Sequence, residues 1–199
     1  DESSDFHPRI DHSAYAISKH FSEMEVWRAS AEGLNTVIVN PGIIIGSGNW
    51  KESSGTLFKE LGENAYTFSG GTSYVDVRDV AQISIELMEK NIFGERFILV
   101  SESAKYEEIG NSIRQKLGKS PMKLLPNVVL KVGFYLNLLF GWLFSPLKMA
   151  NKVNVQSVTE FNKISNKKIK EKLNYKFIPL KESLAFHLEN YKKDRSFNK

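Results

Sequence analysis

Strand-like and helix-like segments alternate along the first part of the chain. A helix is predicted over 14–32, with Gly33 as its stop signal, and Thr36–Asn40 follows as a short β-branched run. Because that run is too apolar for a half-exposed strand, we expect it to be buried on both faces, as in a parallel sheet. Ile43–Ile45 continues it briefly, and a long polar loop covers 46–55.

The next stretch repeats this order of elements. We predict a strand over 72–75, a helix capped by Asp76, a second buried strand over 96–100, and an amphipathic helix over 106–117 that ends at Gly118. This order favours an α/β fold. Two buried strands cannot form a stable parallel sheet, so either the fold is unusual or further strands precede Asp1.

The most hydrophobic segment covers 126–147. Its apolar run of about 13 residues is shorter than the roughly 20 that span a membrane. Val132, Leu136, Leu139 and Leu143 form one stripe at helical spacing, so we predict a helix that faces the core. Helices over 165–173 and 179–191 come after it.

Composition excludes several kinds of site. The chain has no cysteine, and its four histidines are scattered, so we expect no metal site. From Lys148 onward, 13 Lys and Arg stand against 5 Asp and Glu. Only one of these cations is an arginine, and no nucleic-acid-binding module accompanies them, so we expect a solvated lysine face and no nucleic-acid partner. The missing cysteines fit a reducing compartment, and we expect a cytoplasmic protein.

Tyr15 and Lys19 are four residues apart and therefore share one face of the first predicted helix. A nearby ammonium group favours a phenolate, so such a tyrosine can exchange a proton near neutral pH. The spacing alone is common by chance. It gains meaning from the segments after the helix, which are a glycine, a buried β-branched strand and then Asn40-Pro41-Gly42.

These segments in this order resemble the extended branch of the short-chain dehydrogenase/reductase superfamily, the NAD-dependent epimerase/dehydratase superfamily. The resemblance rests on Tyr-x-x-x-Lys and then GLNTVIVNPGIIIGSG, SYVDVRDVA, GERFILVSES and SNKKIKEKLNYKFIPLKESL. It covers most of the chain and is nearest to the dihydroflavonol-reductase-like group. It implies an α/β fold, the C-terminal part of a Rossmann-like doubly wound parallel sheet with a smaller, mostly helical substrate-binding domain.

The resemblance also implies roles for individual residues. Tyr15 would be the general acid/base, and Lys19 would favour its phenolate form and hydrogen-bond the nicotinamide ribose of NAD or NADP. The cofactor pocket would be lined by Tyr15, Lys19, Asn40, Pro41, Gly42, Ile43, Ile44 and, as a weaker candidate, Thr56. Tyr74 and Arg78 would face the substrate, although a strand aromatic and a helix-start cation explain them equally well.

Two features of that family are absent from this sequence. The Gly-rich phosphate turn is missing, since Gly46-Ser-Gly48 lacks the third glycine and comes after the wrong strand. The Ser/Thr that precedes the tyrosine on an earlier strand is missing too. We therefore expect the C-terminal portion of a longer enzyme, inactive by itself. Residues 1–45 would be the remnant of the dinucleotide-binding domain and 46–199 mainly the substrate-binding domain, with 94–101 returning as a sheet strand.

The substrate class has two enzymatic interpretations. Sugar-nucleotide epimerases and dehydratases usually grip the diphosphate with arginines, whereas Thr72-Ser73 stands at the first such place, and no arginine occurs between Arg114 and Arg195. We favour an oxidoreductase that transfers hydride to or from a carbonyl or hydroxyl of a small neutral or lipophilic molecule. The alternative is a nucleoside-diphosphate-sugar epimerase or dehydratase.

A further alternative is a non-catalytic binding protein or a peripheral membrane protein. We do not expect membrane contact, because the apolar helix is more simply explained as core or substrate pocket. The expected partner is a small-molecule substrate, and the resemblance also allows a homodimer through the Tyr/Lys helix.

Overall fold

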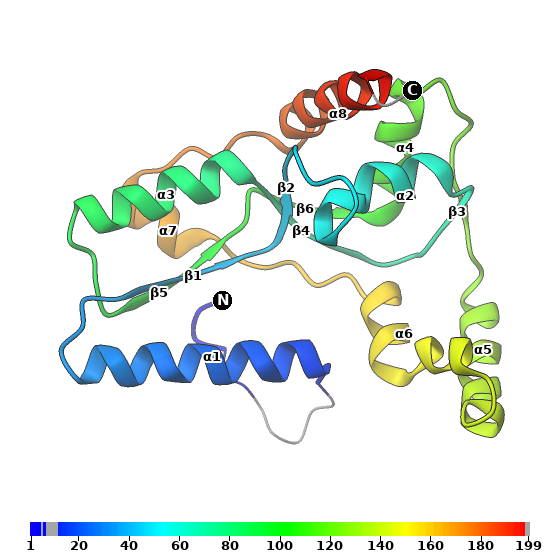
Figure 1. Cartoon of the computed structure of the whole chain (residues 1–199), viewed down its shortest axis with the longest axis horizontal. Coiled ribbons are helices and arrows are strands. Elements are labelled where there is room, and N and C mark those ends of the chain that lie inside the picture. Colours follow the sequence, from blue (N-terminus) through cyan, green and yellow to red (C-terminus); the bar gives the residue numbers. More distant parts are fainter. Residues whose placement is uncertain (5, 7–11, 198–199) are drawn as a thin grey trace. The chain divides into compact units, whose positions relative to one another are not determined.

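The computed structural model describes residues 1–4, 6 and 12–197 (Figure 1). The chain divides into two compact units, each made of three segments. The first unit comprises 1–46, 74–102 and 164–183, and the second comprises 47–73, 103–163 and 184–199. Besides residues 1–45, the first unit contains two later helices that pack against its strands.

The elements come in an order close to the predicted one. The first unit holds α1 (Ala14–Ala31), β1 (Val37–Pro41), β2 (Ile43–Ile45), α3 (Val77–Glu89), β5 (Glu95–Leu99) and α7 (Lys167–Leu173). The second holds the short helix η1 (Ser53–Thr56), α2 (Leu57–Glu63), β3 (Tyr66–Thr67), α4 (Tyr106–Lys116), β7 (Lys123–Leu124), α5 (Asn127–Phe140), the short helix η2 (Ser145–Ala150) and α6 (Lys152–Thr159). Three elements begin in one unit and end in the other: β4 (Gly71–Asp76), β6 (Glu102–Lys105) and α8 (Leu180–Phe197).

Parallel strand pairs organise the first unit. β1 pairs with β5, with Val37 opposite Glu95 and Pro41 opposite Leu99. β2 pairs in parallel with the end of β4, with Ile43 opposite Tyr74. Parallel strands need a long crossover connection, and α3 lies in the connection between β4 and β5. The pairing confirms the parallel α/β arrangement expected from the sequence.

The core of the first unit lies between these strands, α3 and α7. α3 contributes Ile83 and Leu87, and α7 contributes Ile169 and Leu173, each pair four residues apart on one helix face. The buried members of the cluster are Val75, Ile83, Leu87, Phe97, Leu99, Ile169, Leu173 and Phe177. Burial of these apolar side chains is the main force that holds the two helices to the strands.

The helix α1 is different, because none of its residues is buried. It begins at Ser13, whose Oγ accepts a hydrogen bond of 3.1 Å from the amide of Ala16. It ends before Gly33, whose φ of +100° only glycine adopts readily. Both ends agree with the prediction, yet Phe21 and Met24 remain exposed.

The second unit has its own core around α2, α4 and the last part of α8. Its buried apolar side chains are Phe58, Ile109, Ile113, Met122, Leu184, Leu188 and Tyr191. Arg114 is also buried, and its guanidinium donates to the carbonyl oxygens of Ser120, Gly62 and Asn64. These bonds satisfy a charged group that would be costly to bury alone.

The loop after β2 is fixed to α8 within the second unit. The Oγ of Ser47 lies 2.6 Å from the Nδ1 of His187, and the indole Nε1 of Trp50 donates to the Asp194 carboxylate at 2.7 Å. The Trp50 ring also meets the ring of Tyr191 edge-on, with centroids 5.2 Å apart. The loop therefore has a defined position although it is long and polar.

The apolar helix predicted within 126–147 forms as α5, but its predicted core face is wrong. Val132, Leu136, Leu139 and Leu143 are all exposed. The opposite face, with Gly133 and Asn137, is the half-buried one. This face packs on η2, where a Cβ at Gly133 would make an ordinary contact of 3.5 Å with that of Ala150.

Candidate functional site

Tyr15 and Lys19 lie on one face of α1, as their spacing predicts. Tyr15 occupies the first turn and is 71% exposed. The Nζ of Lys19 lies 5.6 Å from the centroid of the Tyr15 ring, within the range of a cation–π contact. The pair is thus assembled by one helix alone, and the phenol is open to solvent.

The predicted cofactor residues at 40–44 form the end of β1 and the start of β2. Asn40 and Pro41 end β1 opposite Ile98 and Leu99 of β5. The amide of Gly42 donates to the carbonyl of Leu99 at 3.0 Å, which closes the pairing. Ile43 and Ile44 continue as β2 and are half-buried. This end of the strand therefore has a fixed backbone.

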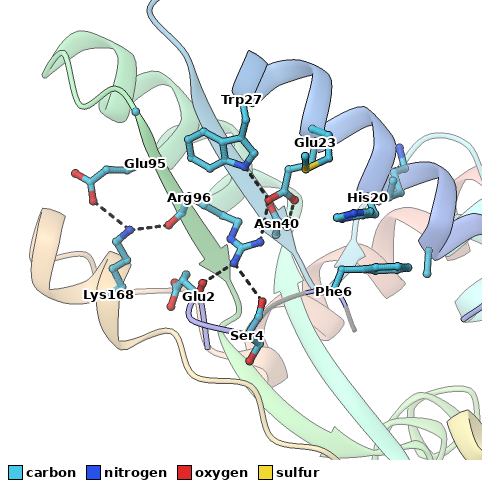
Figure 2. A pocket seen from close by; sticks show the side chains of 14 residues that line it. Glu2, Ser4, Phe6, His20, Glu23, Trp27, Asn40, Glu95, Arg96 and Lys168 are labelled. Carbon is cyan, nitrogen blue, oxygen red and sulfur yellow. Dashed lines mark hydrogen bonds and ion pairs between the residues drawn. The ribbon is translucent and has the colours of Figure 1, made fainter. Parts of the chain in front are cut away.

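A cavity of about 700 Å³ opens beside α1 in the first unit (Figure 2). Of the predicted site residues, Lys19 and Asn40 line it, whereas Tyr15, Pro41, Gly42, Ile43, Ile44, Tyr74 and Arg78 do not. Thr56 belongs to the second unit. The other lining residues are Glu2, Ser4, Phe6, Ala16, His20, Glu23, Met24, Trp27, Gly94, Glu95, Arg96 and Lys168.

The carboxylate of Glu23 lies at the centre of the polar network in this cavity (Figure 2). It accepts hydrogen bonds from Arg96 at 2.9 Å, from the side-chain amide of Asn40 at 3.1 Å and from the indole of Trp27 at 3.3 Å. Burial raises the pKa of Glu23, but the bonds from Asn40, Arg96 and Trp27 outweigh it and leave the pKa below its ordinary value of 4.5. Glu23 is therefore held as a carboxylate.

The rest of the network joins neighbouring segments to the same cavity. Arg96 also donates to the backbone carbonyls of Glu2 and Ser4. Lys168 donates to the carbonyl of Arg96 at 2.9 Å and lies 3.1 Å from the Glu95 carboxylate. The Phe6 and His20 rings stack with centroids 4.1 Å apart. The cavity thus combines cations, carboxylates and aromatic faces.

Sequence reasoning missed Glu23, Arg96 and Lys168. Glu23 carried a signal, because it comes one helical turn after Lys19 and two after Tyr15. Arg96 and Lys168 carried no such signal in the sequence. Arg96 is 73 residues from its partner Glu23, and Lys168 is 72 residues from its partner Arg96. Only the tertiary structure brings these groups together.

The two residues predicted to face the substrate have other surroundings in this structure. Tyr74 is fully buried in the first unit. Arg78 donates to Asp76 from its Nε at 2.9 Å and from a terminal nitrogen at 2.7 Å. Hydrogen bonding to Asp76 raises the pKa of Arg78. Their predicted substrate role stays a prediction.

Metal ligands and membrane-spanning helices are both absent from the part of the chain that the structure describes. Within those ranges, no group of three or more His, Asp or Glu side chains is placed to hold a metal ion. Over the same residues, no helix has the length and apolarity needed to cross a bilayer.

Comparison with known proteins gives the fold but no family model that matches. Among curated proteins, the chain is 30% identical over 109 residues to sterol demethylase protein B of Methylococcus capsulatus. That match covers 53% of this chain and 32% of the relative.

The fold matches solved structures over nearly the whole chain. A nucleoside-diphosphate-sugar epimerase from Pseudomonas aeruginosa superposes with a TM-score of 0.74 at 17% identity, over 98% of this chain and 60% of that one. A dTDP-glucose 4,6-dehydratase from Bacillus anthracis, solved with NAD, superposes with a TM-score of 0.68 at 12% identity, over 98% and 58%. The chain thus spans less than two thirds of the proteins that it matches, and it has the α/β fold of Rossmann-type epimerases and dehydratases.

Proposed function

We propose that the chain is the Tyr/Lys-bearing part of an NAD(P)-dependent enzyme that moves a hydride between a carbinol carbon and a nicotinamide cofactor. The observation that carries this proposal is the placement of Tyr15 and Lys19 together on the exposed face of α1, with Lys19 and Asn40 lining one cavity. The fold of the solved neighbours, several of which contain NAD or NADPH, supports it.

The residues present fit one end of such a cofactor. Lys19 supplies an exposed ammonium for a ribose hydroxyl, and the carboxyl end of β1 is where parallel α/β sheets bind nucleotides. No glycine-rich turn for the pyrophosphate occurs in this sequence. The chain therefore suits the nicotinamide ribose, and the phosphate-binding element would come from another part of the polypeptide.

The chemistry of Tyr15 depends on its position. When a substrate alcohol is oxidised, its hydroxyl proton passes to the Tyr15 phenolate while the carbon–hydrogen bond gives up its electron pair as hydride. In the reverse direction the Tyr15 phenol donates the proton to the carbonyl oxygen. The cofactor supplies only the hydride acceptor or donor.

Two substrate classes fit this chemistry. The epimerase and dehydratase neighbours favour a nucleoside-diphosphate sugar. The similarity to sterol demethylase protein B favours a neutral lipophilic alcohol. The arginine contacts favour it too, since Arg78 is held by Asp76 and Arg114 by backbone carbonyls. Neither guanidinium is presented to a diphosphate in this arrangement.

The test uses a polypeptide that also contains the missing phosphate-binding element. Tyr15→Phe should lower turnover by about 10²–10⁴-fold while leaving cofactor affinity nearly unchanged, because only the transferable proton is lost. Lys19→Met should impair both. Tyr66→Phe, which removes another exposed phenol, from β3, is the matched control. A Tyr15→Phe variant with full turnover would contradict the proposal.

One substrate panel separates the two classes. Nucleoside-diphosphate sugars and hydroxysteroids are each supplied with NAD or NADP, and the absorbance of the reduced nicotinamide is monitored together with sugar products. Turnover of the sugar nucleotides would assign the chain to epimerase or dehydratase chemistry. Turnover of the steroid alcohol alone would assign it to lipophilic alcohols.

A further inference from the structure

The second unit exposes an unusually apolar helix. Eleven apolar side chains of α5 and the turn after it are between 41% and 80% exposed, and Trp142 is the most exposed of them. They are Val128, Val129, Val132, Tyr135, Leu136, Leu138, Leu139, Phe140, Trp142, Leu143 and Phe144. We call this set the α5 apolar face. Contiguous surfaces of this kind on a soluble domain mark sites of interaction.

The orientation of this face is fixed by packing on the other side of the helix. Leu130, Gly133, Phe134 and Asn137 are half-buried, at the spacing of a single helical stripe. That stripe packs on η2 and α6 within the same unit. A rotation of α5 that buried Leu136 or Leu139 would remove Gly133 from its contact with Ala150. The apolar face therefore stays outward.

The charge around this face has one sign. Residues 109–159 contain no Asp and no Glu but seven Lys and Arg. Lys131 lies on α5 itself, and Lys148 and Lys152 lie in η2 and at the start of α6, all three exposed. A surface of exposed leucine, phenylalanine and tryptophan edged by lysine is the chemistry of helices that lie in the headgroup region of a membrane.

We propose that α5 and η2 dock, in the plane of the interface, on a bilayer that contains anionic phospholipid. The helix of 14 residues is about 21 Å long, too short for a hydrocarbon core of about 30 Å. Docking thus buries the apolar face without crossing the membrane. The proposal departs from the sequence-based expectation of no membrane contact, because the residues predicted to face the core face outward.

Charge favours a lipid surface over a second copy of the chain. A twofold pair of α5 faces would bring Lys131, Lys148 and Lys152 of one copy near the same residues of the other. Like charges at short range oppose such a pair. An anionic headgroup layer neutralises the same cations, each of which adds about fivefold to the membrane partition coefficient.

The test is co-sedimentation of the 199-residue chain with vesicles and needs no enzymatic activity, so it is independent of the proposed function. We expect binding to phosphatidylcholine vesicles that contain phosphatidylglycerol. Binding to phosphatidylcholine alone should be about a hundredfold weaker, the combined effect of three cations. Salt should release the bound chain, because it screens the attraction.

Matched variants identify the surface. Leu138→Gln combined with Trp142→Gln should abolish sedimentation, and since both side chains are exposed, circular dichroism and thermal unfolding should stay unchanged. Lys131→Gln should weaken binding about fivefold. Met88→Gln removes another exposed apolar side chain, from α3 in the first unit, and should have no effect.

Three results would overturn the proposal. They are the absence of sedimentation with the anionic vesicles, unchanged sedimentation of the Leu138→Gln/Trp142→Gln variant, and a stable dimer without vesicles that this variant dissociates. The last result would show that a second copy of the chain covers the α5 apolar face.

Discussion

The Glu23 carboxylate is the point at which α1, β1 and β5 meet. Its bonds to Asn40 and Arg96 connect the helix that carries Tyr15 and Lys19 to the strand end where the proposed cofactor site begins. The side chains of Glu23 and Arg96 are 17% and 25% exposed, so solvent screens this ion pair less than one at the surface. Glu23 therefore fixes the position of α1, which has no buried apolar stripe of its own.

Glu23→Gln should make the chain less stable at neutral pH and less sensitive to acid. The folded state lowers the pKa of Glu23, so its contribution to stability is present above the ordinary value of 4.5 and is lost as pH falls through the folded value. We expect a loss of about 1–3 kcal/mol in the free energy of unfolding at pH 7, because three hydrogen bonds to a charged group are weakened.

Urea unfolding measured from neutral to acidic pH checks this. The slope of stability against pH should flatten below pH 4.5 in the Glu23→Gln variant. Glu25→Gln is the control, since Glu25 lies on the same helix in a solvent-exposed pair with Arg28. Equal effects of the two variants would show that Glu23 has no special role in holding α1.

In this region, the sequence predicts the site residues that are placed by their own helix or strand. Tyr15 and Lys19 are paired by helix geometry, and Asn40 is placed by the strand that it ends. Arg96 and Lys168 come from distant segments, and nothing local to either residue indicates a partner. The pattern of a helix predicts which residues share a face, but not which strand that face meets.

At the scale of elements, Gly70 and Gly71 mark a close approach of backbone segments in the second unit. The amides of these glycines donate to the carbonyls of Val158 and Glu160. A Cβ at Gly71 would lie 2.6 Å from the carbonyl oxygen of Ala104 and 2.8 Å from the Cα of Lys105. The start of β4, β6 and the end of α6 thus meet where no side chain fits.

Gly71→Ala should destabilise the second unit by about 1–3 kcal/mol, because backbone atoms must move to admit the methyl group. Gly133→Ala is the matched control, since its Cβ would make an ordinary contact of 3.5 Å with Ala150. That variant should be neutral or up to about 1 kcal/mol more stable, because alanine is the better helix former. Thermal unfolding of both variants measures these changes. Equal stability of the Gly71→Ala and Gly133→Ala variants would contradict the packing described for Gly71.

The sequence predicts the long elements that have a clear pattern and misses the shortest ones. α1, α3, α4 and α7 were predicted because each has a clear stop signal or one apolar stripe. β3 and β7 have two residues each, too few to show a period. The predicted orientation of α5 is wrong because apolar residues surround most of that helix, and the local pattern does not show which face packs on η2 and α6.

At the scale of the whole molecule, the proposed function assigns half of a dinucleotide site to this chain. It contains the Tyr15–Lys19 pair and the end of β1 but no glycine-rich turn. The turn and the helix N-terminus behind it provide most of the affinity for the pyrophosphate in folds of this kind.

The 199-residue chain should therefore bind NAD and NADP very weakly. Isothermal titration calorimetry of the purified chain measures this directly, and we expect no saturation at micromolar cofactor. The longer polypeptide should bind far more tightly under the same conditions. Micromolar binding by the 199-residue chain would show that it contains a complete cofactor site.

The attachment of the loop after β2 to α8 has a consequence for the time course of synthesis. The hydrogen-bond partners of Ser47 and Trp50 are His187 and Asp194, which are synthesised 140 and 144 residues later. At about 5–20 residues per second, these partners leave the ribosome roughly 7–30 seconds after the loop. During that interval the indole of Trp50 has neither Asp194 nor the Tyr191 ring. Protease cleavage near the loop in stalled nascent chains would thus report whether translation has passed α8.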